Sequence, residues 1–153
     1  MSRLASGGQV DRSTSVSFSF DGKTYRGFKG DTLSSALLAN DVRLVARSFK
    51  YHRPRGVLTA GSEEPNALVQ LGVGDQTTPN VRATTQEIFD GLTAESQNRF
   101  PSLKLDLLSV NDMLSPFLSA GFYYKTFMWP KSFWEKLYEP VIRRAAGLGR
   151  LSG

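Results

Sequence analysis

The sequence of 153 residues contains no cysteine and only one histidine, His52. Without cysteine the chain cannot form a disulfide, a thiolate zinc site, a cysteine nucleophile or a Cys-ligated iron–sulfur cluster. One histidine and scattered carboxylates supply no evident set of metal ligands. The sequence also lacks a run of about 20 apolar residues that could cross a membrane. Residues 1–11 lack the apolar core of a secretory signal, so the cytoplasm is the default location.

The composition is that of one folded domain with an appendage. Hydrophobic residues make up 40% of the chain and charged residues 22%, which is ordinary for a globular protein and too apolar for a disordered one. A length of 153 residues corresponds to a single domain. Residues 1–12 are small and polar, and we expect them to be a flexible N-terminus.

Residues 14–28 predict a β-hairpin. Apolar side chains alternate with serines in the first half of this segment, which is typical of a strand with one covered face. The alternating apolar positions are Val16, Phe18 and Phe20. The dipeptide Asp21-Gly22 that follows is favoured in tight hairpin turns. A hairpin that leads into a helix is the opening of an α+β domain of the β-grasp, or ferredoxin-like, type.

A short helix is expected directly after the hairpin, with Asp31 as its N-terminal cap. The apolar stripe at helical spacing is Leu33, Ala36 and Leu37. A loop over residues 56–66 follows, and then strands are expected over 67–73 and 81–85. Pro79-Asn80 is expected to mark a turn between these two strands.

The basic residues of the chain are concentrated in one stretch, residues 42–62, which contains no acid. Its five cations equal the net charge of +5, and Lys and Arg balance Asp and Glu elsewhere. They are Arg43, Arg47, Lys50, Arg53 and Arg55. One interpretation is a solvated loop or edge strand. The other is a patch that meets phosphate or carboxylate on a cofactor or a partner subunit. Only Phe49 and Tyr51 could stack on bases, so nucleic-acid binding is poorly supported.

His52 is the one candidate for general-base chemistry. A catalytic histidine needs an orienting group and a nucleophile, and no nucleophile-elbow motif occurs in the sequence. A structural or phosphate-contacting histidine is therefore the favoured interpretation. Glu63 and Glu64 are adjacent, which indicates a loop pair rather than a two-carboxylate site.

Residues 101–153 predict a helical extension. Residues 107–118 suit a short helix, and residues 122–138 contain eight aromatic side chains. Large aromatic side chains bury about 150–250 Å² each. The segment 122–138 is either an ordinary helical hairpin or, as we favour, a segment that docks on another protein.

Five long and unusual strings carry a family resemblance. They are residues 47–56 (RSFKYHRPRG), 79–84 (PNVRAT), 94–99 (AESQNR), 120–130 (AGFYYKTFMWP) and 138–149 (YEPVIRRAAGLG). Together they resemble the alpha subunits of heterotetrameric sarcosine oxidases, which are amine-oxidising flavoenzymes. The resemblance implies a β-grasp (2Fe-2S ferredoxin-like) domain over residues 13–100. The extension over 101–153 would then lead to a dinucleotide-binding domain that this chain does not contain, so we expect the chain to be a fragment.

The resemblance also implies a setting for the chain. In the parent complex, sarcosine is oxidatively demethylated to glycine, with hydrogen peroxide and either formaldehyde or methylene-tetrahydrofolate as products. NAD, FAD, FMN and tetrahydrofolate would be bound by the complex, and none of them by this chain. Its partners would be the other subunits of the heterotetramer, especially the flavin-bearing beta subunit. We therefore expect a structural or interface domain that has no catalytic residue and is inactive alone.

The candidate contact residues lie in the basic stretch. Lys50, His52, Arg53 and Arg55 are expected to meet a partner subunit or the phosphate of a cofactor. The alternative is a stand-alone module that binds an anionic ligand, nucleic acid included, through the basic loop 43–55.

An iron–sulfur cluster is the family feature that the sequence contradicts. Related domains in other amine-oxidising complexes are implied to hold a [2Fe-2S] cluster through four cysteines, in a loop that corresponds to residues 56–66. That loop offers Thr59, Ser62 and Glu63. Hydroxyls and a carboxylate do not replace thiolates at an iron–sulfur centre. We expect a ferredoxin-like shell without a cluster.

Overall fold

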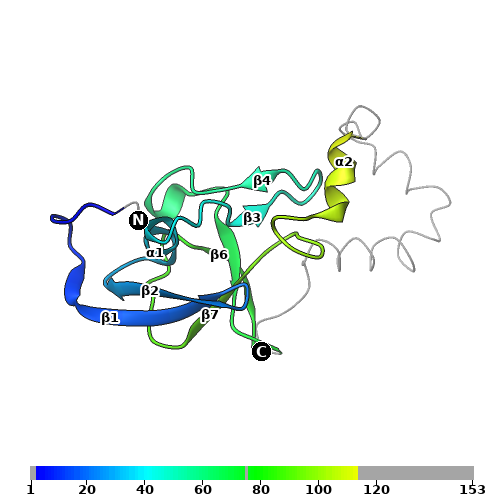
Figure 1. The fold of residues 1–153 in the computed structure, drawn as a ribbon. Helices are drawn as coiled ribbons and strands as arrows, with labels where there is room; N and C mark the ends of the chain where they lie inside the picture. Colours follow the sequence, from blue (N-terminus) through cyan, green and yellow to red (C-terminus); the bar gives the residue numbers. More distant parts are fainter. Residues whose placement is uncertain (1–2, 75, 114–153) are drawn as a thin grey trace.

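The computed structural model of the chain describes residues 3–74 and 76–113. A five-stranded mixed sheet carries one helix on its inner face, and a small two-stranded sheet lies to one side (Figure 1). This is the α+β, β-grasp arrangement that the sequence predicts. No helix among the described residues is long and apolar enough to span a membrane.

The five strands of the main sheet lie in the order β2–β1–β7–β5–β6. Their bounds are β1 Asp11–Phe20, β2 Lys23–Lys29, β5 Leu68–Leu71, β6 Thr78–Arg82 and β7 Leu92–Ser96. The central pair, β1 and β7, is parallel, and the other pairs are antiparallel. Strands β2 and β6 form the two edges.

The remaining elements connect and cover this sheet. They are α1 (Leu33–Ala39), β3 (Ala46–Arg47), β4 (Pro54–Arg55), the 3₁₀ turns η1 (Gly61–Glu63) and η2 (Leu107–Ser109), and α2 (Val110–Met113). Strands β3 and β4 pair with each other in the small sheet. The loop at their tip lies beside α2 (Figure 1).

The predicted hairpin is confirmed. Phe18 pairs with Tyr25 across β1 and β2, and their rings stack with centroids 5.9 Å apart. Val16, Phe18 and Phe20 are all buried, as their alternation predicts. They join the buried stripe of α1 and residues of β5 and β7 in one core. The period-two pattern therefore identified the inner face of the sheet correctly.

The helix cap is one residue later than the sequence suggests. Thr32 is the N-cap of α1, and its hydroxyl accepts a hydrogen bond from the backbone N–H of Ser35 at 3.2 Å. Asp31 is buried just before the cap, where its carboxylate accepts from the N–H of Phe28, the hydroxyl of Ser35 and the guanidinium of Arg3. Burial raises the pKa of Asp31, but these hydrogen bonds outweigh it and hold the pKa below its ordinary value.

Two expectations about the strands were wrong. Pro79-Asn80 lies within β6 rather than in a turn, because β6 is an edge strand, where a missing N–H is tolerated. The strand over 81–85 accordingly begins earlier and ends at Arg82. Strand β7 was not predicted at all, although it is central. Its inward residues include Ala94 and Ser96, whose small side chains give only a weak alternating signal.

Only the start of the expected C-terminal extension belongs to the described residues. The helix expected over 107–118 is represented by η2 and α2, which together cover 107–113. The remaining part of that helix and the aromatic segment 122–138 lie outside the described residues.

Candidate functional site

The basic loop between β3 and β4 is held in a tight conformation by its own backbone. The N–H of His52 donates to the carbonyl of Ser48 at 3.0 Å, and the N–H of Ser48 donates to the carbonyl of Arg53 at 2.9 Å. His52 has a φ of 54°, which is an uncommon conformation for a residue other than glycine. The loop therefore turns its histidine back toward the protein interior, where the residue is 7% exposed.

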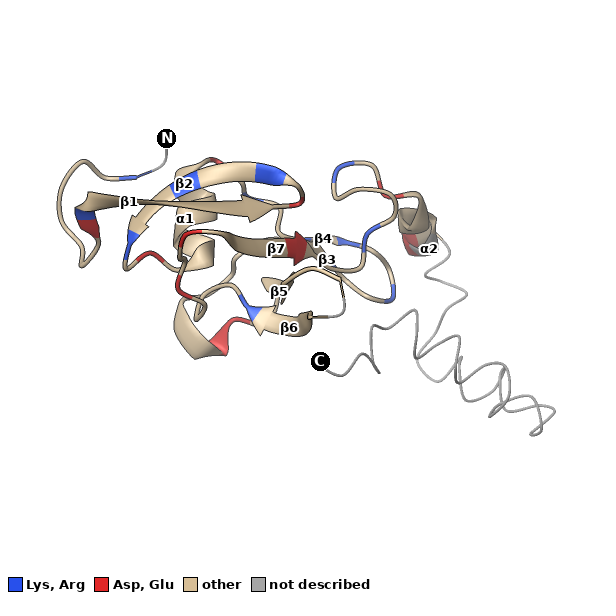
Figure 2. Cartoon of the chain, turned by 90° about the horizontal axis from the view of Figure 1, so that it is seen from below, with Lys and Arg blue, Asp and Glu red and all other residues tan. Residues whose placement is uncertain are grey.

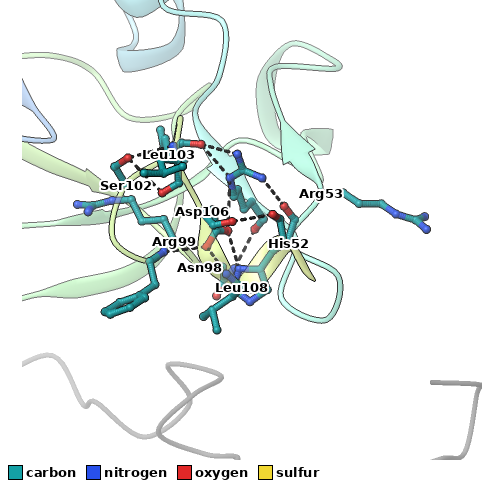
Figure 3. Close-up of polar contacts among 12 residues, drawn as sticks. His52, Arg53, Asn98, Arg99, Ser102, Leu103, Asp106 and Leu108 are labelled. Atoms are coloured by element: carbon teal, nitrogen blue, oxygen red, sulfur yellow. Dashed lines mark hydrogen bonds and ion pairs between the residues drawn. The ribbon is translucent and has the colours of Figure 1, made fainter. Parts of the chain in front are cut away.

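The carboxylate of Asp106 is hydrogen-bonded to the ring of this histidine (Figure 3). Asp106 Oδ2 lies 2.8 Å from His52 Nδ1 and 3.4 Å from Arg47 Nε. This contact orients the imidazole ring through Nδ1. Asp106 Oδ1 accepts from the backbone N–H groups of Phe100 and Leu108 at 3.0 and 3.1 Å. The side chain of Asp106 is fully buried.

Arg47 completes the cluster. Its Nε and one terminal nitrogen donate to the carbonyl of Leu103 at 2.9 and 2.6 Å, and the other terminal nitrogen donates to the carbonyl of His52 at 2.7 Å. The residue is 9% exposed. We call Arg47, His52 and Asp106 the Asp106 anchor, because these side chains tie the basic loop to the segment that follows β7.

The Asp106 anchor contains a carboxylate–imidazole pair like that of a catalytic triad. A carboxylate orients the imidazole through Nδ1, as the aspartate of a triad does. Among residues 3–74 and 76–113, however, no serine or threonine hydroxyl is hydrogen-bonded to the ring of His52. The other contacts of Asp106 and Arg47 are to backbone groups. Within the described part of the chain, the arrangement therefore fixes two segments against each other.

The remaining cations of the stretch have separate surroundings. Arg53 points away from the anchor (Figure 3) and pairs with Asp112 of α2 at 2.8 Å, with side chains that are 57% and 46% exposed. Figure 2 shows this basic loop beside the acidic residue of α2. Lys50 and Arg53 both lie over the ring of Tyr51, 4.9 Å from its centroid. Arg55 donates to the side-chain oxygen of Asn66.

The five cations of residues 42–62 therefore do not lie together on one surface. Arg47 belongs to the interior, whereas Arg43 and Arg53 are exposed. A hollow of about 750 Å³ opens between the basic loop and the segment 105–113. The side chains that line it include Tyr51, Arg53, Leu107 and Met113. Among the described residues, no group of three or more metal-ligating side chains is present.

A second buried carboxylate, Glu64, lies in the loop that precedes β5. It is 1% exposed and accepts four backbone hydrogen bonds within residues 57–67. Burial raises the pKa of Glu64, but the N–H donors of the loop outweigh it and keep the pKa below its ordinary value. Its neighbour in the sequence, Glu63, is exposed, so the two carboxylates of the expected loop pair have different surroundings. Loop residues have no burial period, so hydrophobic patterning could not separate the two.

Comparison with known proteins gives one family match and several relatives. Residues 13–99 match the family described as 2Fe-2S iron-sulfur cluster binding domain. The sarcosine oxidase subunit alpha of Rhizobium meliloti (strain 1021) is 65% identical over 98% of this chain and 15% of its own length. That of Corynebacterium sp. (strain U-96) is 41% identical over 58% of this chain and 9% of its own length. The chain thus spans a small part of the relatives that it matches.

These comparisons confirm the resemblance to sarcosine oxidase alpha subunits and the ferredoxin-like fold. A solved structure, L-proline dehydrogenase from P. horikoshii, is 29% identical over 57% of this chain and 16% of its own chain. Its TM-score is 0.45.

The residues of the chain do not fit the cluster that the matched family is described as binding. A [2Fe-2S] cluster is held by four thiolates, or by two thiolates and two imidazoles. The sequence has no cysteine and one histidine, and that histidine is engaged by Asp106. No electron-transfer step through such a cluster can therefore be assigned to this chain.

Proposed function

The chain belongs to the family of 2Fe-2S iron–sulfur cluster binding domains, and on this premise we propose that it is the N-terminal structural domain of a sarcosine-oxidase-type alpha subunit. The observation that carries the proposal is the 65% identity with one such subunit over 98% of the chain. The absence of cysteine supports a structural role, because the chain cannot hold the electron carrier for which its family is described.

The parent complex would oxidatively demethylate sarcosine to glycine. Hydrogen peroxide and either formaldehyde or methylene-tetrahydrofolate would be the other products. NAD, FAD, FMN and tetrahydrofolate would bind to other parts of the complex. This domain would supply no group that touches substrate, because its one imidazole is buried against Asp106. The complex would be cytoplasmic.

The role of the domain would be to present the basic loop to a neighbouring subunit, above all the flavin-bearing beta subunit. The Asp106 anchor supports this, because it fixes the loop against the segment that leads on to the following chain. Arg53 and Lys50 would make the outward contacts with an acidic surface or a phosphate. His52 would act by holding the loop in shape, and Arg55 by its contact with Asn66.

The alternative, a stand-alone module for an anionic ligand or nucleic acid, has less support. The side chain of Arg47 is buried and contacts Asp106, and Arg53 forms an ion pair with Asp112. Fewer cations therefore face outward than the sequence suggests, and Tyr51 lies under two of them. Such a module would bind its ligand with a steep dependence on salt.

The test of the proposed function is assembly. The complete alpha subunit that carries this sequence would be co-expressed with the other subunits, with Lys50→Glu and Arg53→Glu introduced together. We expect the complex to be lost or weakened on gel filtration, and sarcosine-dependent peroxide formation to fall with it. The matched control is Arg26→Glu, which changes an exposed cation on β2. Assembly that is unaffected by the double variant would contradict the role of the loop, and sarcosine-dependent peroxide formation by the 153-residue chain alone would contradict the structural assignment.

A further inference from the structure

The loop of residues 57–67, which we call the Glu64 loop, is folded around a negative charge. Oε2 of Glu64 accepts from the N–H groups of Leu58 and Thr59 at 2.8 and 2.6 Å, and from the hydroxyl of Thr59 at 3.4 Å. Oε1 accepts from the N–H groups of Asn66 and Ala67 at 2.7 and 3.0 Å. Both oxygens are thus fully used, and the donors come from the two ends of the loop.

The inward direction of these amides is the unusual feature of the loop. Backbone N–H groups that converge on one point create an anion site, because their dipoles add. Left without an acceptor and away from water, each of them would carry the cost of an unsatisfied donor. No cation contacts the carboxylate in the hydrogen bonds and ion pairs of the described residues. The amides themselves are therefore what stabilises the buried charge.

The Glu64 loop lies within residues 13–99, which match the family described as 2Fe-2S iron-sulfur cluster binding domain. Plant-type [2Fe-2S] domains hold their cluster with the spacing C-x4-C-x2-C and a fourth, distant cysteine. Thr59, Glu64 and Ala67 have that spacing in this sequence. Thr84, in the turn after β6, reaches the same loop, since its hydroxyl donates to the carbonyl of Gly61 at 2.6 Å. The loop therefore has positions at this spacing within a domain of a cluster-binding family, and none of them carries a thiolate.

We propose that Glu64 is a built-in substitute for the iron–sulfur cluster. Its carboxylate supplies the negative charge and the acceptors that amides of such a loop otherwise give to the sulfurs of a cluster. The loop is thereby ordered without iron, sulfide or any other added ligand. The inference concerns the folding of this loop alone and does not depend on the proposed function of the domain.

The test removes the carboxylate and returns one from solution. In the complete polypeptide that carries this sequence, Glu64→Ala is expected to speed hydrogen–deuterium exchange at the amides of residues 58, 59, 66 and 67 on the order of 100-fold. Formate or acetate should slow these four amides again, whereas chloride at equal ionic strength should not. The unmodified protein should respond to neither salt.

Two further variants keep the test decisive. Glu63→Ala removes the exposed neighbouring carboxylate and should leave the four amides protected. Glu64→Gln serves if the alanine variant does not fold, since its carbonyl oxygen can satisfy only one end of the loop. It should expose two of the four amides and not the other two. Protection of all four amides in both Glu64 variants, or exposure that formate and acetate do not reverse in a folded alanine variant, would overturn the proposal.

Discussion

Glu64 and Asp106, two of the buried carboxylates among the described residues, are stabilised in different ways. Glu64 is surrounded by neutral donors that lie within six residues of it in the sequence. Asp106 also accepts backbone N–H groups, but it is paired with an imidazole 54 residues away and with the guanidinium of Arg47. The first arrangement can order only its own loop. The second connects two segments that are distant in the sequence, residues 47–52 and the segment after β7.

The difference predicts how each site fails. Without Glu64, neutral amides are left without acceptors. Without Asp106, the buried guanidinium of Arg47 loses its countercharge and the ring of His52 loses its hydrogen-bond partner. An unpaired buried charge costs more than an unpaired neutral donor. Substitutions at the Asp106 anchor should therefore have the larger effect on stability, and the predictions below follow that order.

The largest effect is expected for Asp106→Ala. Breaking a buried ion pair by removing one partner costs about 3–5 kcal/mol, and here the hydrogen bonds to Phe100 and Leu108 are lost as well. Urea denaturation of the 153-residue chain, followed by circular dichroism, measures the loss. The control is Asp112→Ala, whose exposed pair with Arg53 should contribute at most about 1 kcal/mol. Equal effects of the two substitutions would remove the distinction between the anchor and the surface pair.

A smaller effect is expected for Glu64→Gln. The amide keeps one acceptor and turns an NH₂ group toward N–H donors, which should cost about 1–3 kcal/mol in the free energy of unfolding. The same urea titration measures it. Glu63→Gln, on the exposed neighbour, should stay within about 0.5 kcal/mol of the unmodified chain. A Glu64→Gln chain as stable as the Glu63→Gln chain would show that the buried charge is not needed.

The pH dependence should separate the contribution of Glu64 further. A carboxyl group whose pKa is lower in the folded than in the unfolded state adds stability above the unfolded pKa and loses it as the pH falls through the folded pKa. The difference in stability between the unmodified chain and Glu64→Gln should therefore be constant from about pH 7 to about pH 5 and shrink below about pH 4. Urea titrations at several pH values test this. A difference that grows in acid would mean that the sign of the shift is wrong.

The smallest effect is expected for Arg53→Ala. Its contacts with Asp112 and Tyr51 are largely solvent-exposed, and such pairs contribute about 0–1 kcal/mol. The midpoint of urea denaturation should barely move, and the little that is lost should disappear at high salt. A loss as large as that of Asp106→Ala would place Arg53 among the residues that hold the fold.

The sequence predicts the parts of the fold that follow a regular pattern. Alternation along β1 and helical spacing in α1 depend on neighbouring residues, and both identified the buried face. The pairing of His52 with Asp106 could not be found in this way, because a contact over 54 residues leaves no local period. Glu64 lies in a loop, where burial follows hydrogen bonding rather than hydrophobicity.

The central claim is that Glu64 and Asp106 have separate tasks, and amide exchange tests it most directly. Glu64→Gln and Asp106→Asn would be compared in the same complete polypeptide by hydrogen–deuterium exchange. Glu64→Gln should expose amides within residues 57–67 and leave residues 47–53 and 100–108 protected, and Asp106→Asn should do the reverse. Exposure of both regions by either substitution would show that the loop and the anchor form one cooperative unit, and would contradict the account.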